Sequence, residues 1–230
     1  MSRSWYAQIP NMITFTSLIC AFTAVVLAAE QRLLPAGYCI ITAYILDAFD
    51  GEVARRLGVS SSFGIQLDSL VDIVALGMGP SIVMYQHLVD LGMSAAIAWG
   101  AGMIFMVGGA FRLARFNLQP EKQSHSDTMG LTISTSGATL TLSVLANVAY
   151  GNDLIPPAFY PAIAVLLMLL MISRISYPPL ARIVRRSWVT IVGIAGIVAI
   201  SIWLTPQLVW FAILGGYASF GAARALVRAF

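Results

Sequence analysis

Long apolar stretches separated by short polar ones dominate the chain. The apolar stretches cover residues 12–29, 33–57, 65–88, 93–116, 130–150, 157–175, 188–204 and 207–226, and Pro, Gly, Asn or charged residues separate them. A helix needs about 20 apolar residues to cross the hydrocarbon core of a bilayer. Unpaired backbone groups are costly in lipid, and the stretches lack the strict alternation of barrel strands. The pattern therefore predicts an all-α integral membrane protein, a single bundle of about eight transmembrane helices.

The composition agrees with this fold class. Of the 230 residues, 59% are hydrophobic and only 10% are charged, whereas soluble domains carry about 25% charged residues. The predicted spans leave room only for loops and short tails, so we expect one membrane domain over residues 1–230. The net charge of +3 is explained by topology and anionic lipid headgroups, and we expect no nucleic-acid partner.

The cationic residues predict the orientation of the bundle, because Lys and Arg concentrate in short cytoplasmic loops. With the N-terminus inside, all of the 13 Lys and Arg residues except Arg32 fall on the cytoplasmic side. They are Arg3, Arg55, Arg56, Arg112, Arg115, Lys122, Arg174, Arg182, Arg185, Arg186, Arg224 and Arg228. A span miscounted by one would move every later loop to the other side. We therefore expect an even number of spans and both termini in the cytoplasm.

Four aspartates lie inside or at the ends of the second and third apolar stretches. They are Asp47, Asp50, Asp68 and Asp72. Ionisable residues at membrane depth are costly and are functional candidates by default. Helical spacing puts Asp47 and Asp50 on neighbouring faces of one helix, and Asp68 and Asp72 on one face of the next. Such carboxylates repel one another, and a hard divalent cation such as Mg²⁺ is the simplest compensation.

The spacing around these aspartates carries a family resemblance. The chain reads Asp47-Ala-Phe-Asp50-Gly51-Glu-Val-Ala54-Arg55, then eight residues, then Gly64-Ile-Gln-Leu-Asp68-Ser-Leu-Val-Asp72. This run resembles the signature DxxDGxxAR(x8)GxxxDxxxD of the CDP-alcohol phosphotransferases at every fixed position. The resemblance implies a binuclear Mg²⁺ or Mn²⁺ site held by all four aspartates, with Asp72 also acting as the general base. An acceptor hydroxyl would attack the phosphorus beside the lipid, and CMP would leave while cations offset the phosphate charge.

The resemblance also implies a site for the CDP-alcohol. Gly51 and Ala54 are small where the nucleotide approaches, and Arg55 is placed to pair with phosphate or to anchor the helix end in headgroups. Similar proteins contact the nucleotide from the start of the first span and from the linker between the two aspartate helices. The matching candidates are Asn11, Thr14, Ser61 and Gly64. Asn11 could instead cap the first helix.

Four further stretches resemble one branch of this family, the CDP-diacylglycerol-dependent phosphatidylserine synthases. They are residues 68–81, 112–117, 129–132 and 173–178. The resemblance implies CDP-diacylglycerol and L-serine as substrates, and CMP and phosphatidylserine as products. It further implies a homodimer among membrane lipids, in the inner membrane of a prokaryote, with the active site facing the cytoplasm. The chain departs from that branch after Gly130-Leu131, where it reads Thr-Ile-Ser-Thr-Ser-Gly137 instead of proline and small alanines.

The acceptor site has three candidate residues. Arg112 and Arg115 stand one turn apart and could clamp a carboxylate, such as that of serine, or a phosphate, with Asn117 near the ammonium or backbone. Alternatively, both arginines only anchor a helix end in headgroups. Other acceptors remain open, namely glycerol 3-phosphate, inositol phosphate or an amino alcohol. A second class of function is an ion-coupled transporter whose aspartates bind the coupling cation, although broken helices and paired halves are not evident in the sequence.

Overall fold

The computed structural model describes residues 8–59, 61–118, 128–177 and 206–229. The span predicted at residues 188–204 and Lys122 lie outside these ranges. Within them, helices dominate, and four stretches are long and apolar enough to cross a membrane. These are Gln8–Ala29, Leu33–Ala54, Ser62–Asp90 and Ala95–Asn117. The prediction of an all-α membrane protein with several spans is confirmed for the described residues by the length and composition of these helices.

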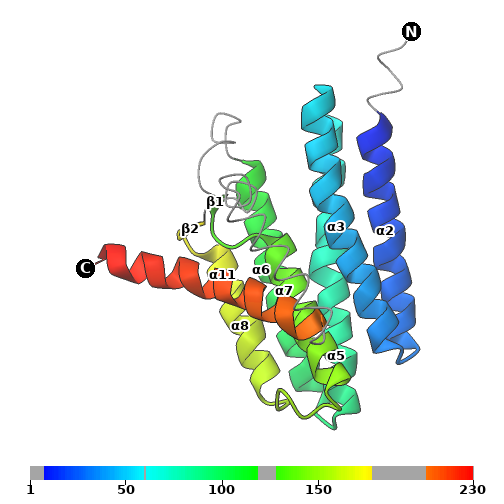
Figure 1. Cartoon of the computed structure of the whole chain (residues 1–230), viewed down its shortest axis with the longest axis vertical. Coiled ribbons are helices and arrows are strands. Elements are labelled where there is room, and N and C mark those ends of the chain that lie inside the picture. The colour runs from blue at the N-terminus through cyan, green and yellow to red at the C-terminus, as the bar shows by residue number, and fades with distance from the viewer. Residues whose placement is uncertain (1–7, 60, 119–127, 178–205, 230) are drawn as a thin grey trace.

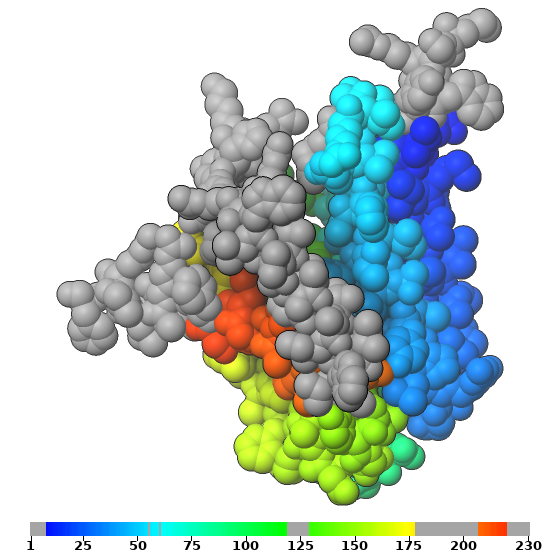
Figure 2. Space-filling view, viewed as in Figure 1, coloured from blue at the N-terminus to red at the C-terminus, as the bar shows by residue number. Residues whose placement is uncertain are grey.

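The first two helices form an antiparallel pair, α2 (Gln8–Ala29) and α3 (Leu33–Leu57), joined by a short turn at residues 30–32. Helix α2 buries one residue every three or four positions, and most of these residues are small, as at Ser17, Ala21 and Ala24. Small residues let membrane helices approach closely, and the Ser17 hydroxyl donates to the Ala43 carbonyl across 3.2 Å. Figures 1 and 2 show the pair along one edge of the molecule.

The third span is continuous but not uniformly α-helical. It consists of α4 (Ser62–Asp72), a π-helical turn η1 (Ile73–Met78) and α5 (Gly79–Asp90). The sequence pattern predicts one uninterrupted helix here, and the structure differs for a local reason. Pro80 has no N–H for the carbonyl four residues earlier, at Leu76, and its ring would clash with that carbonyl in an α-helix. A π-turn widens the helix at this point.

The remaining described helices complete the bundle. They are α6 (Ala95–Asn117), α7 (Ile133–Ala149), α8 (Phe159–Ile172) and α11 (Pro206–Ala229). Helix α7 is buried on nearly every face, so it is the central helix. Figure 1 shows α11 crossing the direction of the other helices. Two short strands pair in antiparallel fashion. Strand β1 (Thr128–Met129) precedes α7, and strand β2 (Ser176–Tyr177) follows α8.

Candidate metal and nucleotide site

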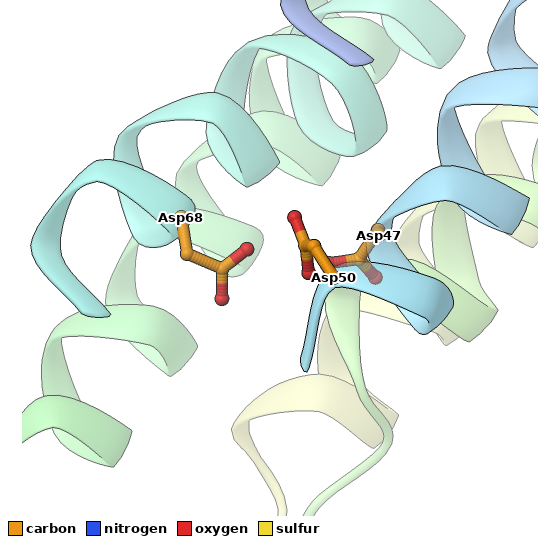
Figure 3. Close-up of side chains that lie close together, drawn as sticks. All are labelled: Asp47, Asp50 and Asp68. Carbon is orange, nitrogen blue, oxygen red and sulfur yellow. The ribbon is translucent and has the colours of Figure 1, made fainter. Parts of the chain in front are cut away.

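Three carboxylates converge between α3 and α4. Asp47 and Asp50 come from α3 and Asp68 comes from α4, and Figure 3 shows their side chains pointing toward one another. One oxygen of each lies within 4.8 Å of the others. The cluster is partly enclosed, since Asp50 is only 4% exposed. A set of close carboxylate oxygens is the ligand chemistry that Mg²⁺ and Mn²⁺ take in proteins, so these residues fit a divalent cation.

Asp72 joins the cluster from the end of α4, one turn beyond Asp68. Its carboxyl group interacts electrostatically with those of Asp47 and Asp68, and the side chain is 8% exposed. The structure therefore brings Asp72 close to the other signature aspartates.

Thr14 binds the cluster directly from α2. Its hydroxyl lies 2.7 Å from Oδ2 of Asp50 and 3.0 Å from the Pro10 carbonyl, and it can donate its single hydrogen to either oxygen. The carboxylate of Asp50 is thus oriented from a neighbouring helix. Thr14 was predicted as a contact to the CDP-alcohol, and the structure gives it a position beside a metal-ligand candidate.

Asn11, Ser61 and Gly64 come together at the start of α4. Ser61 caps the helix by accepting the Gly64 N–H at 3.0 Å. A Cβ on Gly64 would lie 3.2 Å from the Ser61 hydroxyl and 3.5 Å from the Asn11 side-chain oxygen. Because α2 already begins at Gln8, Asn11 is inside the helix and does not cap it. The free N–H groups at a helix start suit a phosphate group.

The other nucleotide candidates follow the aspartates along α3. Gly51 and Ala54 are half-buried, at spacings of four and seven residues from Asp47, so they share its face. The side chain of Arg55 lies outside the described part of the structure. Its neighbour Arg56 pairs with Glu52 at 2.7 Å on the exposed side of the helix.

Arg112 lies inside the bundle and faces the carboxylate cluster. Its side chain is 6% exposed and interacts electrostatically with Asp72 and Asp47. The guanidinium carbon stands 5.3 Å from the ring centre of Phe116. Its Nε has no hydrogen-bond partner among the described residues. A buried cation with a spare donor beside the cluster is suited to an anionic group of a substrate.

Arg115 and Asn117 have other partners. Arg115 donates from Nη1 to the Ile172 carbonyl at 2.6 Å, and its Nη2 reaches the carbonyls of Met171 and Ser173 at 3.2 and 3.1 Å. It thereby caps the carboxyl end of α8, where carbonyls lack helical partners. The Asn117 amide donates to the Ser69 hydroxyl on α4 at 3.0 Å. The predicted acceptor set is therefore divided, and Arg112 is the member that faces the aspartates.

The sequence interpretation missed two hydroxyl groups from the first turn of α7. The side chain of Ser134 lies close enough to Asp47 to interact with its carboxyl group, and that of Thr135 lies close to the Tyr44 hydroxyl. Thr132 caps this helix by accepting the Thr135 N–H at 3.1 Å. Their sequence signal is the group of hydroxyl residues within 132–136. This is also where the chain departs from the sequence pattern of the phosphatidylserine synthases.

The comparisons with known proteins agree with the signature. A profile of the CDP-alcohol phosphatidyltransferase family matches residues 7–173, which include α2, the aspartate cluster, Arg112 and the first turn of α7. The chain belongs to this family, as the signature predicted. Relatives named CDP-diacylglycerol–serine O-phosphatidyltransferase are similar to it. The protein of Helicobacter pylori is 32% identical over 74% of this chain and 71% of its own length. That of Methanocaldococcus jannaschii is 33% identical over 74% and 73%, and that of Bacillus subtilis 32% over 74% and 89%.

Proposed function

We propose that this chain transfers the phosphatidyl group of CDP-diacylglycerol to the hydroxyl of L-serine, releasing CMP and forming phosphatidylserine. The observation that carries the proposal is the convergence of Asp47, Asp50 and Asp68 within 4.8 Å in a chain whose relatives are named for this reaction. Family membership favours a transferase over an ion-coupled transporter as the use of these aspartates.

The four aspartates would hold two Mg²⁺ or Mn²⁺ ions. When bound, such ions offset the charge of the two phosphates and of the departing CMP. Thr14 orients Asp50 by a hydrogen bond, and Ser134 lies beside Asp47; both come from outside the two aspartate helices. Asp72 accepts the proton of the serine hydroxyl, the role that the family resemblance implies for it.

The CDP-alcohol lies between the starts of α2 and α4. Asn11, Ser61 and the first N–H groups of α4 bind the nucleotide end, and Gly64 leaves room for it. Gly51 and Ala54 let it approach the face of α3, and Arg55 pairs with phosphate. The acyl chains extend into the surrounding lipid, where α2 already exposes Met12, Phe15 and Ile19.

Serine binds on the other side of the cluster. Arg112 pairs with its carboxylate, which puts the serine hydroxyl toward Asp72. Arg115 and Asn117 hold the surrounding helix ends and do not contact the amino acid, because their donors are already bound to Ile172 and Ser69. A buried guanidinium fits an anionic acceptor and so favours serine over choline. Glycerol 3-phosphate and inositol phosphate are also anionic, and it is the names of the relatives that favour serine over them.

The active site faces the cytoplasm of a prokaryotic inner membrane, in one domain of about eight spans with both termini inside. The support is the distribution of charge. Arg56, Arg112, Arg115 and Arg174 lie at the end of the bundle that carries the aspartates, whereas Arg32 lies in the turn at the opposite end. We further propose a homodimer, as the family resemblance implies.

The test is an acceptor screen with detergent-purified protein. CMP release from CDP-diacylglycerol is measured after addition of L-serine, glycerol 3-phosphate, inositol phosphate or choline. We expect serine alone to drive release, and Asp68→Asn to abolish it because an amide is a poor ligand for Mg²⁺. Asp153→Asn is the matched control, since this carboxylate is exposed in the loop between α7 and α8. Release driven by another acceptor would reject serine, and full activity in the presence of a chelator would reject the metal site.

A further inference from the structure

Helix α7 contacts both halves of the carboxylate cluster. On the α3 side, the Ser134 side chain lies close enough to Asp47 to interact with its carboxyl group. On the other side, one turn further along α7, Gly137 lies against the π-turn that follows Asp72. The carboxyl groups of Asp47 and Asp72 interact electrostatically with each other. A single helix therefore contacts the elements that carry two interacting aspartates.

The contact at Gly137 is between two backbones. A Cβ added there would meet the carbonyl oxygen of Leu76 and would lie 3.0 Å from its carbonyl carbon and 3.1 Å from its Cα. A side chain could rotate away from such a methyl group, but a helix backbone cannot. Any residue larger than glycine must therefore push α7 and the π-turn apart.

The π-turn follows Asp72 directly, so the contact at Gly137 affects the position of Asp72. Asp72 is the residue immediately before the turn, and Leu76 follows it by four residues. Pro80 cannot donate an α-helical hydrogen bond to the Leu76 carbonyl, and the Gly79 N–H donates to the Val74 carbonyl, five residues earlier. The end of the turn is also held by Ser81, whose hydroxyl lies 2.8 Å from the Gly77 carbonyl and 3.0 Å from that of Gly102 on α6.

We propose that α7 is a brace that sets the separation of Asp47 and Asp72, with Ser134 and Gly137 as positioning residues for the metal site and the general base. The expected effect on turnover rests on the proposed function. The spacing of Asp47 and Asp72 depends only on contacts within this chain. Proper spacing of ligands matters because a misplacement of about 1 Å can cost on the order of a hundredfold in rate.

Three glycine substitutions of equal size test the brace. Gly137→Ala inserts a methyl group against backbone. Gly109→Ala, on α6, inserts one against the flexible ends of Ile133 and Ile73, whose nearest atom is 2.6 Å away. Gly100→Ala meets nothing within 4 Å. Ser134→Ala removes the other contact of the brace without adding bulk, so it serves where Gly137→Ala fails to fold.

Each purified variant is assayed for Mn²⁺ affinity by electron paramagnetic resonance, for melting temperature, and for kcat and KM of serine. We expect Gly137→Ala and Ser134→Ala to weaken Mn²⁺ binding about tenfold or more. For Gly137→Ala, kcat falls by about ten- to a hundredfold with little change in the KM of serine. Gly100→Ala should match the unmodified protein, and Gly109→Ala should keep its Mn²⁺ affinity.

Unchanged Mn²⁺ affinity in both Gly137→Ala and Ser134→Ala would overturn the brace. An equal loss of Mn²⁺ affinity in Gly109→Ala would overturn it too, because general crowding of the bundle would then explain the result. Failure of the proposed function looks different. In that case the unmodified protein releases no CMP with serine, whereas the ranking of Mn²⁺ affinities among the variants remains.

Discussion

The two arginines near the end of α6 should respond oppositely to substitution, although they are only one turn apart. Arg115 binds the backbone at the end of α8, and its bond to the Ile172 carbonyl is 2.6 Å long. A hydrogen bond to a charged group contributes about 1.5–3 kcal/mol. Loss of that bond alone should lower the melting temperature of Arg115→Ala by roughly 3–12 °C for a chain of this size. The KM of serine should change little.

Arg112 should show the converse. Its Nε has no hydrogen-bond partner among the described residues, so Arg112→Ala should lower the melting temperature less than Arg115→Ala does. The lost contact with the serine carboxylate, about 1.5–3 kcal/mol, should raise the KM of serine by about 10- to 150-fold. The KM of CDP-diacylglycerol should stay largely unchanged, because Arg112 faces the acceptor side of the cluster.

The assay pairs steady-state CMP release at varied serine with thermal unfolding in the same detergent. Lysine at each position separates charge from shape, because a lysine cannot reproduce a bidentate guanidinium contact. A serine KM raised by Arg115→Ala at unchanged melting temperature would refute the assignment of these roles. So would a destabilised Arg112→Ala with the KM of serine unaltered.

Other predictions follow from the same contacts. Asp72→Asn should retain CMP binding, measured by calorimetry, better than it retains turnover, because it removes a proton acceptor as well as a ligand; an equal loss of binding and turnover would contradict this role. Thr14→Val should weaken Mn²⁺ binding about tenfold, since the Asp50 carboxylate loses a charged hydrogen bond; unaltered affinity would show that Thr14 does not orient the site. A single cysteine at Arg56 should be labelled only from the cytoplasm, and one at Asp90 only from outside; the reverse pattern would invert the proposed topology.

The sequence predicted those features that depend on helical spacing within one segment. The stretch at residues 33–57 coincides with α3 (Leu33–Leu57), and that at 93–116 differs from α6 (Ala95–Asn117) by one or two residues. The aspartates could be grouped because their spacing fixes which face of a helix each one occupies. That two aspartate helices pack together followed from their adjacency in the chain.

Features that depend on contacts between distant segments were not predictable in this way. Arg115 binds a helix end that lies more than 50 residues later in the chain. Its position one turn from Arg112 therefore did not indicate which groups it contacts. Ser134 reaches Asp47 only because α7 is the central helix. The π-turn had a local signal in Gly79-Pro80, which the apolar pattern alone conceals.

The most direct test of the central claim follows labelled serine into lipid. Purified protein is incubated with Mg²⁺ or Mn²⁺, CDP-diacylglycerol and L-serine labelled with carbon-14, and the lipids are then extracted and separated. The account predicts one labelled phosphatidylserine for each CMP released, and neither product after chelation or in Asp68→Asn. Label that stays in the aqueous phase while glycerol 3-phosphate drives CMP release would contradict the proposed acceptor and with it the role given to Arg112.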